Sequence, residues 1–225
     1  MLLQTHETHG YASAFFTPAN AESYDSVARW ATLGQDIAWK KSIIAAIGSQ
    51  KKVLELASGT GILTSMLESK GNSVTGLDLT RSYLVQARKK ARFSLMQGTA
   101  EALPFKREAF DAIASSYLMK YVDMAFVARE CFAALRPGGI VVFHDFTLPR
   151  GQIMRAFWKI HFRVLRTIGA FAPSWRIVFQ SLEKVIADSF WEHKALLALK
   201  DAGFVHIRLQ YFTAGTAAML SAEKP

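Results

Sequence analysis

Two glycines and an aspartate give this sequence the means to bind a nucleotide. Gly59 and Gly61 follow an apolar run and precede a helical pattern, and a turn without side chains lets the backbone approach a ligand closely. Asp78 ends the next apolar run, at the spacing of about 20 residues where a carboxylate accepts hydrogen bonds from both ribose hydroxyls. The third glycine of the dinucleotide pattern GxGxxG is missing, because Ile62-Leu63-Thr64 follows Gly61. The spacing predicts a cofactor that contains adenosine.

Glu55 distinguishes between the two cofactors that fit this spacing, NAD and S-adenosylmethionine. It stands beside the glycine turn, where its carboxylate could bind the ammonium group of a methionine moiety, directly or through water. NAD carries no such ammonium. The alternative is that Glu55 only caps the following helix, because helix N-termini favour carboxylates. The residues favour S-adenosylmethionine over NAD and leave the capping role open.

These residues need a scaffold of alternating strands and helices. Short apolar runs alternate with longer helical patterns, which is typical of βαβ units on a parallel sheet. The expected strands are 52–56, 73–78, 93–97, 111–115, 140–146, 205–212 and 216–222, and the expected core helices are 62–70, 81–90, 124–135 and 192–202. We expect an α/β fold: a Rossmann-like, seven-stranded, mostly parallel sheet with helices on both faces and an antiparallel last strand.

The length of 225 residues suits one substantial core. We expect a single domain made of a helical N-terminal cap (1–50), a cofactor-binding core (51–148), a helical insertion after the fifth strand (149–189), and a C-terminal helix and strand pair (190–225).

Four segments carry a family resemblance. They are Val53-Leu54-Glu55-Leu56-Ala57-Ser58-Gly59-Thr60-Gly61, Gly98-Thr99-Ala100-Glu101-Ala102-Leu103-Pro104-Phe105, Phe110-Asp111-Ala112-Ile113 and Leu135-Arg136-Pro137-Gly138-Gly139. Together they resemble class I S-adenosylmethionine-dependent methyltransferases of the ubiquinone/menaquinone biosynthesis C-methyltransferase (UbiE/MenG-type) family. The resemblance extends from Tyr24 to the end of the chain.

The resemblance implies S-adenosylmethionine as cofactor and a lipid quinol precursor, such as a demethylmenaquinol, as methyl acceptor. It implies cofactor contacts at Thr60, Asp78, Thr99, Ala100 and Ser116. With their neighbours, the candidate cofactor-binding residues are Glu55, Ala57, Ser58, Gly59, Thr60, Gly61, Asp78, Leu79, Thr99, Ala100, Glu101 and Ser116.

Two positions depart from the family pattern. Many relatives have Asp or Asn where this chain has Thr99, whose hydroxyl is a weaker acceptor for the adenine amino group. Quinone methylases typically carry an Arg-Asn pair where this chain reads Tyr117-Leu118-Met119-Lys120-Tyr121.

Methylation of a ring carbon requires removal of the quinol proton, so we expect a general base or an ordered water. The candidates are Tyr24, Tyr117, His144 and Asp145, by their positions in the cap or at the carboxyl ends of strands, where open α/β sheets bind ligands. His144 could equally be a packed residue of its strand, and Asp145 could instead shape the pocket. No metal-ligand spacing occurs, because Cys131 is the single cysteine.

A basic and apolar helix is expected within the insertion. Arg155, Lys159, Arg163 and Arg166 project within about 80° of one another on a helix, and Ile153, Met154, Phe157, Ile160, Val164, Leu165 and Ile168 fill the opposite side. This pattern is typical of a helix at an anionic membrane interface. The alternative is that the apolar side packs on the sheet and the basic side is solvated.

Net charge and cysteine usage narrow the partners and the compartment. A charge of +9 suits an anionic partner, but no nucleic-acid module is recognisable, so we expect no nucleic acid. The lone cysteine, and the absence of a signal-peptide pattern or membrane-spanning run, indicate a protein that is either cytosolic or peripherally attached to the inner face of the membrane. The oligomeric state stays open.

Two other functions fit the same features. A phospholipid (phosphatidylethanolamine) N-methyltransferase, or another small-molecule methyltransferase, would use the basic helix without a strong base. A protein that binds S-adenosylmethionine without methylating would explain Thr99 and Met119-Lys120 as traces of lost or altered chemistry.

Overall fold

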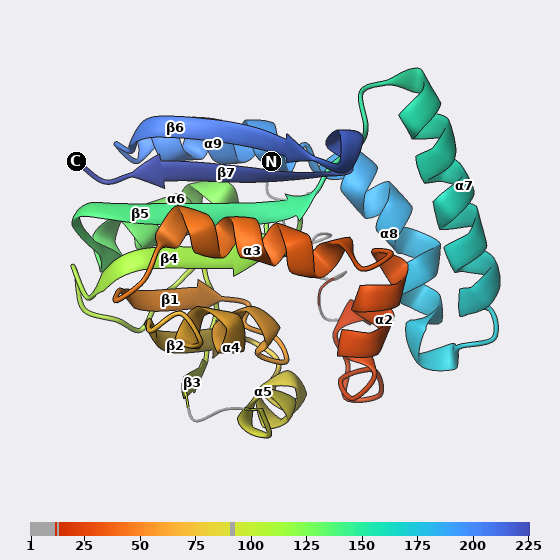
Figure 1. The fold of residues 1–225 in the computed structure, drawn as a ribbon, viewed down its shortest axis with the longest axis horizontal. Helices are drawn as coiled ribbons and strands as arrows, with labels where there is room; N and C mark the ends of the chain where they lie inside the picture. Colours follow the sequence, from red (N-terminus) through yellow and green to blue (C-terminus); the bar gives the residue numbers. More distant parts are fainter. Residues whose placement is uncertain (1–11, 13, 91–92) are drawn as a thin grey trace.

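The computed structural model describes residues 12, 14–90 and 93–225 (Figure 1). Seven strands form one sheet in the order β3-β2-β1-β4-β5-β7-β6. The strands are β1 (Lys52–Leu56), β2 (Ser73–Asp78), β3 (Ser94–Gln97), β4 (Phe110–Ser116), β5 (Leu135–Phe146), β6 (Val205–Phe212) and β7 (Ala217–Glu223). All neighbours pair in parallel except β7, which is antiparallel to both β5 and β6. The predicted sheet, with its antiparallel last strand, is confirmed.

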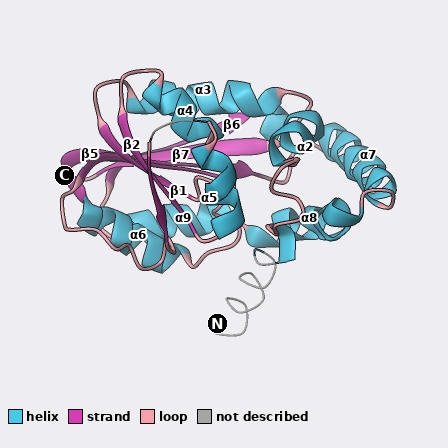
Figure 2. Ribbon diagram, turned by 90° about the horizontal axis from the view of Figure 1, so that it is seen from below, coloured by secondary structure: helices cyan, strands magenta, loops and turns pink. Residues whose placement is uncertain are grey.

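Helices cover both faces of this sheet (Figure 2). One layer contains α3 (Gln35–Ile47) and α4 (Ile62–Glu68), and the other contains α6 (Met124–Ala134) and α9 (Trp191–Asp201), while α5 (Arg81–Arg88) packs near β2 and β3. Strand side chains alternate between the layers: Val53 packs with α3 and α4, whereas Leu54 and Leu56 pack with α6 and α9.

Three further helices lie beyond the carboxyl ends of β1, β4 and β5 (Figure 1). They are α2 (Tyr24–Ala31), α7 (Gln152–Gly169) and α8 (Arg176–Ser189), with the short helix η1 (Pro173–Trp175) before α8; η2 (Thr213–Gly215) joins β6 to β7. Phe15 from the N-terminal segment packs in one apolar cluster with Trp158, Phe162 and Phe179 from the insertion. Two segments far apart in the sequence therefore share a core above the ends of the strands.

The apolar side that the sequence predicted for the insertion helix is largely exposed in the structure. The residues of α7 that are buried are Trp158, Phe162, Leu165 and Gly169. Ile153, Phe157, Ile160, Val164 and Ile168 are exposed instead. The reason is that α7 packs on α8 rather than on the sheet, and this contact needs only a narrow stripe of side chains. The alternative in which the apolar side packs on the sheet is therefore wrong.

One predicted strand boundary differs from the structure by several residues, whereas the others agree to within one residue. β5 begins at Leu135 rather than at residue 140, because the backbone at Leu135 is already extended and pairs with Phe110 across a register shift. Pro137-Gly138-Gly139 thus form an irregular first part of the strand, with Gly138 at φ 73°. Within the described ranges, no helix is both long and apolar enough to cross a membrane.

Candidate active site

The turn between β1 and α4 has the backbone shape that the glycine spacing predicted. Gly59 and Gly61 have φ values of 56° and 80°, in the left-handed region that favours glycine. A Cβ on Gly61 would lie 2.7 Å from the ring of Phe93, so a side chain at this position would displace a packed aromatic. The N–H of Gly61 donates to the carbonyl of Ser58 at 2.9 Å, which closes the turn.

Asp78 lies at the end of β2 and holds this turn. One oxygen of its carboxylate accepts the N–H of Gly59 at 2.8 Å, and the other accepts the N–H of Thr80 at 2.8 Å. Burial raises the pKa of Asp78, and the two backbone N–H groups oppose that shift. Each carboxylate oxygen keeps a second lone pair, so Asp78 can still accept from two hydroxyl groups.

Ser58 and Glu55 lie beside the turn in different ways. The hydroxyl of Ser58 is buried and has no hydrogen-bond partner within the described part of the chain, so it is a polar group available to a ligand. Glu55 is buried and accepts from the hydroxyl of Thr64 in the first turn of α4, which is the capping position considered above. Burial raises the pKa of Glu55 to about 8.

The raised pKa of Glu55 makes stability depend on pH. The folded protein keeps the Glu55 proton up to about pH 8, whereas the unfolded chain releases it near the ordinary value of 4.5. The folded state therefore binds more protons between these values, and the free energy of unfolding falls as pH rises through them. Urea unfolding at about pH 6 and about pH 8 measures this decrease in the free energy of unfolding, and we expect it to be absent from Glu55→Gln. The exposed control Glu22→Gln should keep it; an unchanged profile in Glu55→Gln would contradict the assignment.

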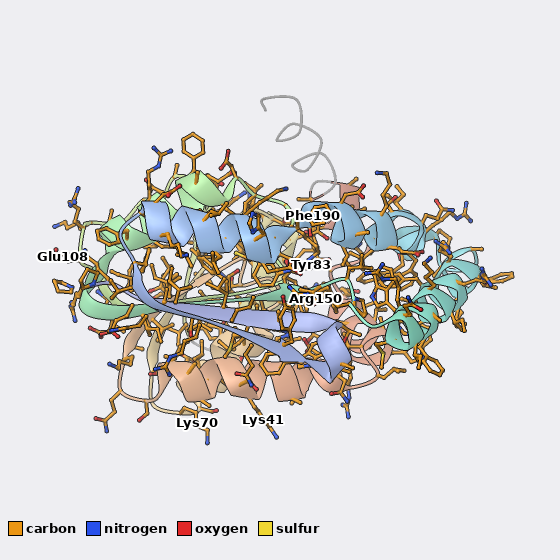
Figure 3. The ribbon with its side chains drawn as sticks, turned by 90° about the horizontal axis from the view of Figure 1, so that it is seen from above. Lys41, Lys70, Tyr83, Glu108, Arg150 and Phe190 are labelled. Carbon is orange, nitrogen blue, oxygen red and sulfur yellow. The ribbon has the colours of Figure 1, made fainter. Side chains whose placement is uncertain are left out.

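The N-terminal cap covers the glycine turn from above. Thr60 donates its hydroxyl to Asp25 of α2, which also pairs with Lys90. Tyr24 packs edge-on against Tyr83 at 5.3 Å between ring centroids, and Tyr83 lies inside the molecule (Figure 3). Burial is the main cause that raises the pKa of Tyr24, with the carboxylates of Asp36, Asp25 and Asp78 adding to it. Tyr24 is therefore close to the turn, as a residue of the cap.

The candidate cofactor-binding residues that follow β2 and β3 lie in three different places: near the end of β2, at the start of α6 and on the surface. The N–H of Gly98 donates to the carbonyl of Asp78 at 3.1 Å, which places the following Thr99 and buried Ala100 near the end of β2. The carboxylate of Glu101 instead accepts the N–H of Asp123 at 2.8 Å, at the start of α6. Leu79 is 61% exposed.

A buried polar cluster lies at the ends of β4 and β5. Tyr117 has a left-handed backbone, with φ 70°, and its phenol donates to Asp36 at 2.7 Å. Lys40, one turn further along α3, pairs with the same carboxylate. The Tyr117 ring stacks on Phe146 with 4.6 Å between centroids. Burial, with Asp36 next, raises the pKa of Tyr117 well above its usual value.

His144 adjoins this cluster from β5. Its Nδ1 lies 3.1 Å from the hydroxyl of Ser116, and its Nε2 is buried with no partner among the described residues. Burial, with Lys40 and Lys120 next, lowers the pKa of His144 well below its usual range, so the ring is neutral. Ser116, a candidate cofactor contact, is thus bonded to His144.

Asp145 is occupied by structural partners. It accepts from the ammonium of Lys120 at 2.6 Å and from the N–H of Phe146 at 2.7 Å, and Lys120 also donates to the carbonyl of Tyr117 at 2.8 Å. Burial raises the pKa of Asp145, and Lys120 opposes that shift. Sequence reasoning did not assign roles to Asp36, Lys40 and Lys120. The spacing of Asp36 and Lys40, four residues apart on a helix, was the available signal.

An apolar cavity of about 480 Å³ lies next to this cluster. Its walls come from the junction of α2 and α3, from the end of β5, and from α7 and α8. Trp39 and Phe146 form the wall nearest to the cluster, since Trp39 lies 5.5 Å from the His144 ring and Phe146 stacks on Tyr117. Within the described residues, no cluster of three or more His, Cys, Asp and Glu side chains could hold a metal ion.

Known proteins match the chain over most of its length. A sequence model of the ubiE/COQ5 methyltransferase family matches residues 8–224. The chain is 33% identical to a ubiquinone/menaquinone biosynthesis C-methyltransferase UbiE of Desulfotalea psychrophila, over 88% of this chain and 84% of the relative. It is 29% identical to a demethylmenaquinone methyltransferase of Mycolicibacterium paratuberculosis, over 91% of this chain and 90% of the relative.

Solved structures share the fold at low identity. An S-adenosylmethionine-dependent methyltransferase from Mesorhizobium loti superposes with a TM-score of 0.60 and 20% identity, over 83% of this chain and 96% of that one. A possible histamine N-methyltransferase from Thermotoga maritima gives 0.63 and 17%, over 92% and 98%. At these identities the likeness shows the fold alone.

Proposed function

Because the chain belongs to the ubiE/COQ5 methyltransferase family, we propose that it transfers the methyl group of S-adenosylmethionine to a ring carbon of a lipid quinol such as a demethylmenaquinol. The membership confirms the enzyme class and the cofactor predicted from the sequence. The observation that carries the acceptor is the arrangement at the carboxyl end of β4: the glycine turn follows the neighbouring strand β1, and an apolar cavity suited to a lipid lies beside Phe146, which stacks on Tyr117.

The residues beside the turn fit the cofactor. Asp78 would accept from the ribose hydroxyls, the unpartnered hydroxyl of Ser58 would find a partner, and Thr99 and Ala100 would lie beside the adenine. When bound, S-adenosylmethionine supplies a methyl group already activated by its sulfonium sulfur. The protein then has two tasks: to hold the acceptor carbon in line and to remove the quinol proton.

His144 is the base that the surroundings favour among the four candidates. The phenol of Tyr117 is bonded to Asp36, the carboxylate of Asp145 is bonded to Lys120, and Tyr24 is held protonated by its raised pKa. His144 is neutral, and its Nε2 has no hydrogen-bond partner within the described residues. In the tautomer whose Nδ1–H donates to Ser116, that Nε2 carries a lone pair that can accept a hydrogen bond from the quinol, while the lowered pKa makes it a weak base.

The function is tested with purified protein, S-adenosylmethionine and a demethylmenaquinol in detergent micelles, followed by mass spectrometry of the quinone. A methylated quinone is expected, and His144→Gln should form it about a hundredfold more slowly while binding the cofactor normally. With a whole lipid extract, methylated phosphatidylethanolamine instead would identify an N-methyltransferase. Formation of no S-adenosylhomocysteine with either would favour a binding protein.

We also propose that α7 rests on an anionic membrane surface, which would make the protein peripheral on the inner face of the membrane. Ile153, Phe157 and Ile160 expose 77%, 61% and 55% of their surface, which suits burial among lipid chains. Arg166 pairs with Glu183 of α8. The basic residues left for headgroups are Arg155, Lys159 and Arg163, which form no ion pair within the described residues.

Charge reversal on α7 should abolish sedimentation with anionic vesicles. The variant carries Arg155→Glu, Lys159→Glu and Arg163→Glu, and it should lose at least about tenfold in binding, since each basic side chain contributes ~1 kcal/mol at such a surface. The matched control carries Lys41→Glu, Lys70→Glu and Lys200→Glu; Lys41 and Lys70 point away from the molecule on the α3 side (Figure 3). Equal binding by both triple variants would contradict the proposal.

A further inference from the structure

The apolar cavity contains polar side chains that are already satisfied by the protein. The indole N–H of Trp39 donates to the hydroxyl of Thr213 at 3.0 Å, and His161 Nε2 lies 2.9 Å from the carbonyl of Ala31. The hydroxyl of Thr32 donates to the carbonyl of Ala28 at 2.8 Å. These groups face protein partners rather than the cavity interior, so the space suits an apolar chain and not a nucleotide, a sugar or a charged headgroup.

One end of the cavity meets the candidate reaction centre. Phe146 lines the cavity and stacks on Tyr117, and Trp39 lines it beside His144. The other end of a molecule with an apolar chain in the cavity would therefore lie against Phe146 and Trp39, whose rings contact Tyr117 and His144. An aromatic ring at that end would pack among aromatic side chains.

The other end is open on α7. Phe157, Ile160 and Val164 line the cavity, yet they are 61%, 55% and 47% exposed. They also belong to the exposed apolar stripe that continues to Ile153 and Ile168. A chain too long for about 480 Å³ would leave the protein across this stripe, where apolar side chains replace water along its path.

We propose that this cavity binds the isoprenoid chain of the acceptor, and that the chain passes between α7 and the junction of α2 and α3, through the opening at Phe157, Ile160 and Val164. The inference rests on the proposed function for the identity of the ring. A chain held between Phe146 and the surface of α7 would let a lipid keep the far part of its chain in the bilayer while its ring is methylated.

The test places a bulky side chain in the opening. Val164→Trp narrows it, and Ala156→Trp adds the same bulk to the exposed surface of α7 outside the cavity. Two demethylmenaquinols serve as acceptors, one with a long isoprenoid chain and one with a single isoprene unit. For the long-chain acceptor, Val164→Trp should raise KM by at least about tenfold, since excluding about two methylene groups from apolar contact has that effect.

The single-isoprene acceptor and S-adenosylmethionine binding should be unchanged in both variants. If both tryptophan variants raise KM equally, or if the single-isoprene acceptor is affected as strongly as the long one, the proposed path is wrong.

A second measurement does not depend on activity. A photoreactive farnesyl alcohol, crosslinked to the protein and mapped by peptide mass spectrometry, should label the cavity walls on α7 and α8 in wild type and Ala156→Trp, and less in Val164→Trp. Labelling outside the cavity would overturn the proposal. The proposal would also be wrong if a second copy of the protein covered the opening: the protein would then form concentration-dependent dimers that block labelling, and Phe157→Glu would abolish these dimers. If no quinol is methylated yet the cavity is labelled, the proposed function fails while the chain site stands.

Discussion

Asp78→Asn is expected to weaken the binding of S-adenosylmethionine by at least about a hundredfold. The two carboxylate oxygens of Asp78 accept from Gly59 and Thr80, and an amide has only one oxygen, so its NH₂ group would face a backbone N–H. The variant would lose both the shape of the turn and a charged acceptor for the ribose. Hydrogen bonds to charged groups contribute ~1.5–3 kcal/mol each, and the loss of about two gives a factor of roughly 100.

Calorimetric titration with S-adenosylmethionine, and separately with NAD, measures this effect. Asp188→Asn is the matched control, because Asp188 is an exposed residue of α8 that pairs with Lys184 far from the turn. Wild type and control should bind S-adenosylmethionine alone. Unchanged affinity in Asp78→Asn would remove Asp78 from the site, and binding of NAD would contradict the assignment of the cofactor.

Lys120→Met is expected to destabilise the protein by about 3–5 kcal/mol, because it leaves a buried carboxylate without its cation. Lys120 and Asp145 have side chains that are 1% and 0% exposed. The substitution also removes the ammonium that donates to the carbonyl of Tyr117, so the loop after β4 loses one of its connections to β5. Urea unfolding followed by circular dichroism measures the change in the free energy of unfolding.

The double variant Lys120→Met, Asp145→Asn separates the lost charge pair from lost packing. Asparagine keeps an oxygen for the N–H of Phe146 but carries no charge, so the double variant should recover at least half of the lost stability. A double variant as unstable as Lys120→Met would show that the ammonium acts through its bond to Tyr117 and not through the pair. This outcome would revise the role given to Asp145.

The cofactor turn was predictable because its determinants are local. The apolar runs that became β1 and β2 have the predicted bounds, and Gly59, Gly61 and Asp78 meet because adjacent parallel strands bring their carboxyl ends to one edge. The left-handed backbone at Gly61 could be expected from the residue type, because glycine adopts positive φ values without steric cost. The central strands were recognisable as short apolar runs because helices cover and bury both faces of the sheet.

The second half of the site depends on residues that the sequence keeps far apart. Tyr117 bonds to Asp36, 81 positions away, and Asp145 pairs with Lys120 across two strand ends. No local pattern specifies such partners, because each side chain could satisfy its charge or hydrogen bond in water. The packing of α3 against the sheet excludes water from these side chains. Each buried polar group then needs a hydrogen-bond or ion-pair partner within the protein.

Helix α7 shows the same limit most clearly. Its sequence established an amphipathic helix with a basic stripe, and the structure contains that helix. Which apolar residues are buried was decided by its neighbour: α8 covers Trp158, Phe162 and Leu165 and leaves Phe157, Ile160 and Val164 in the open. Periodicity reports that a helix has an apolar side but not what lies against it, so the opening of the cavity exists only in the tertiary structure.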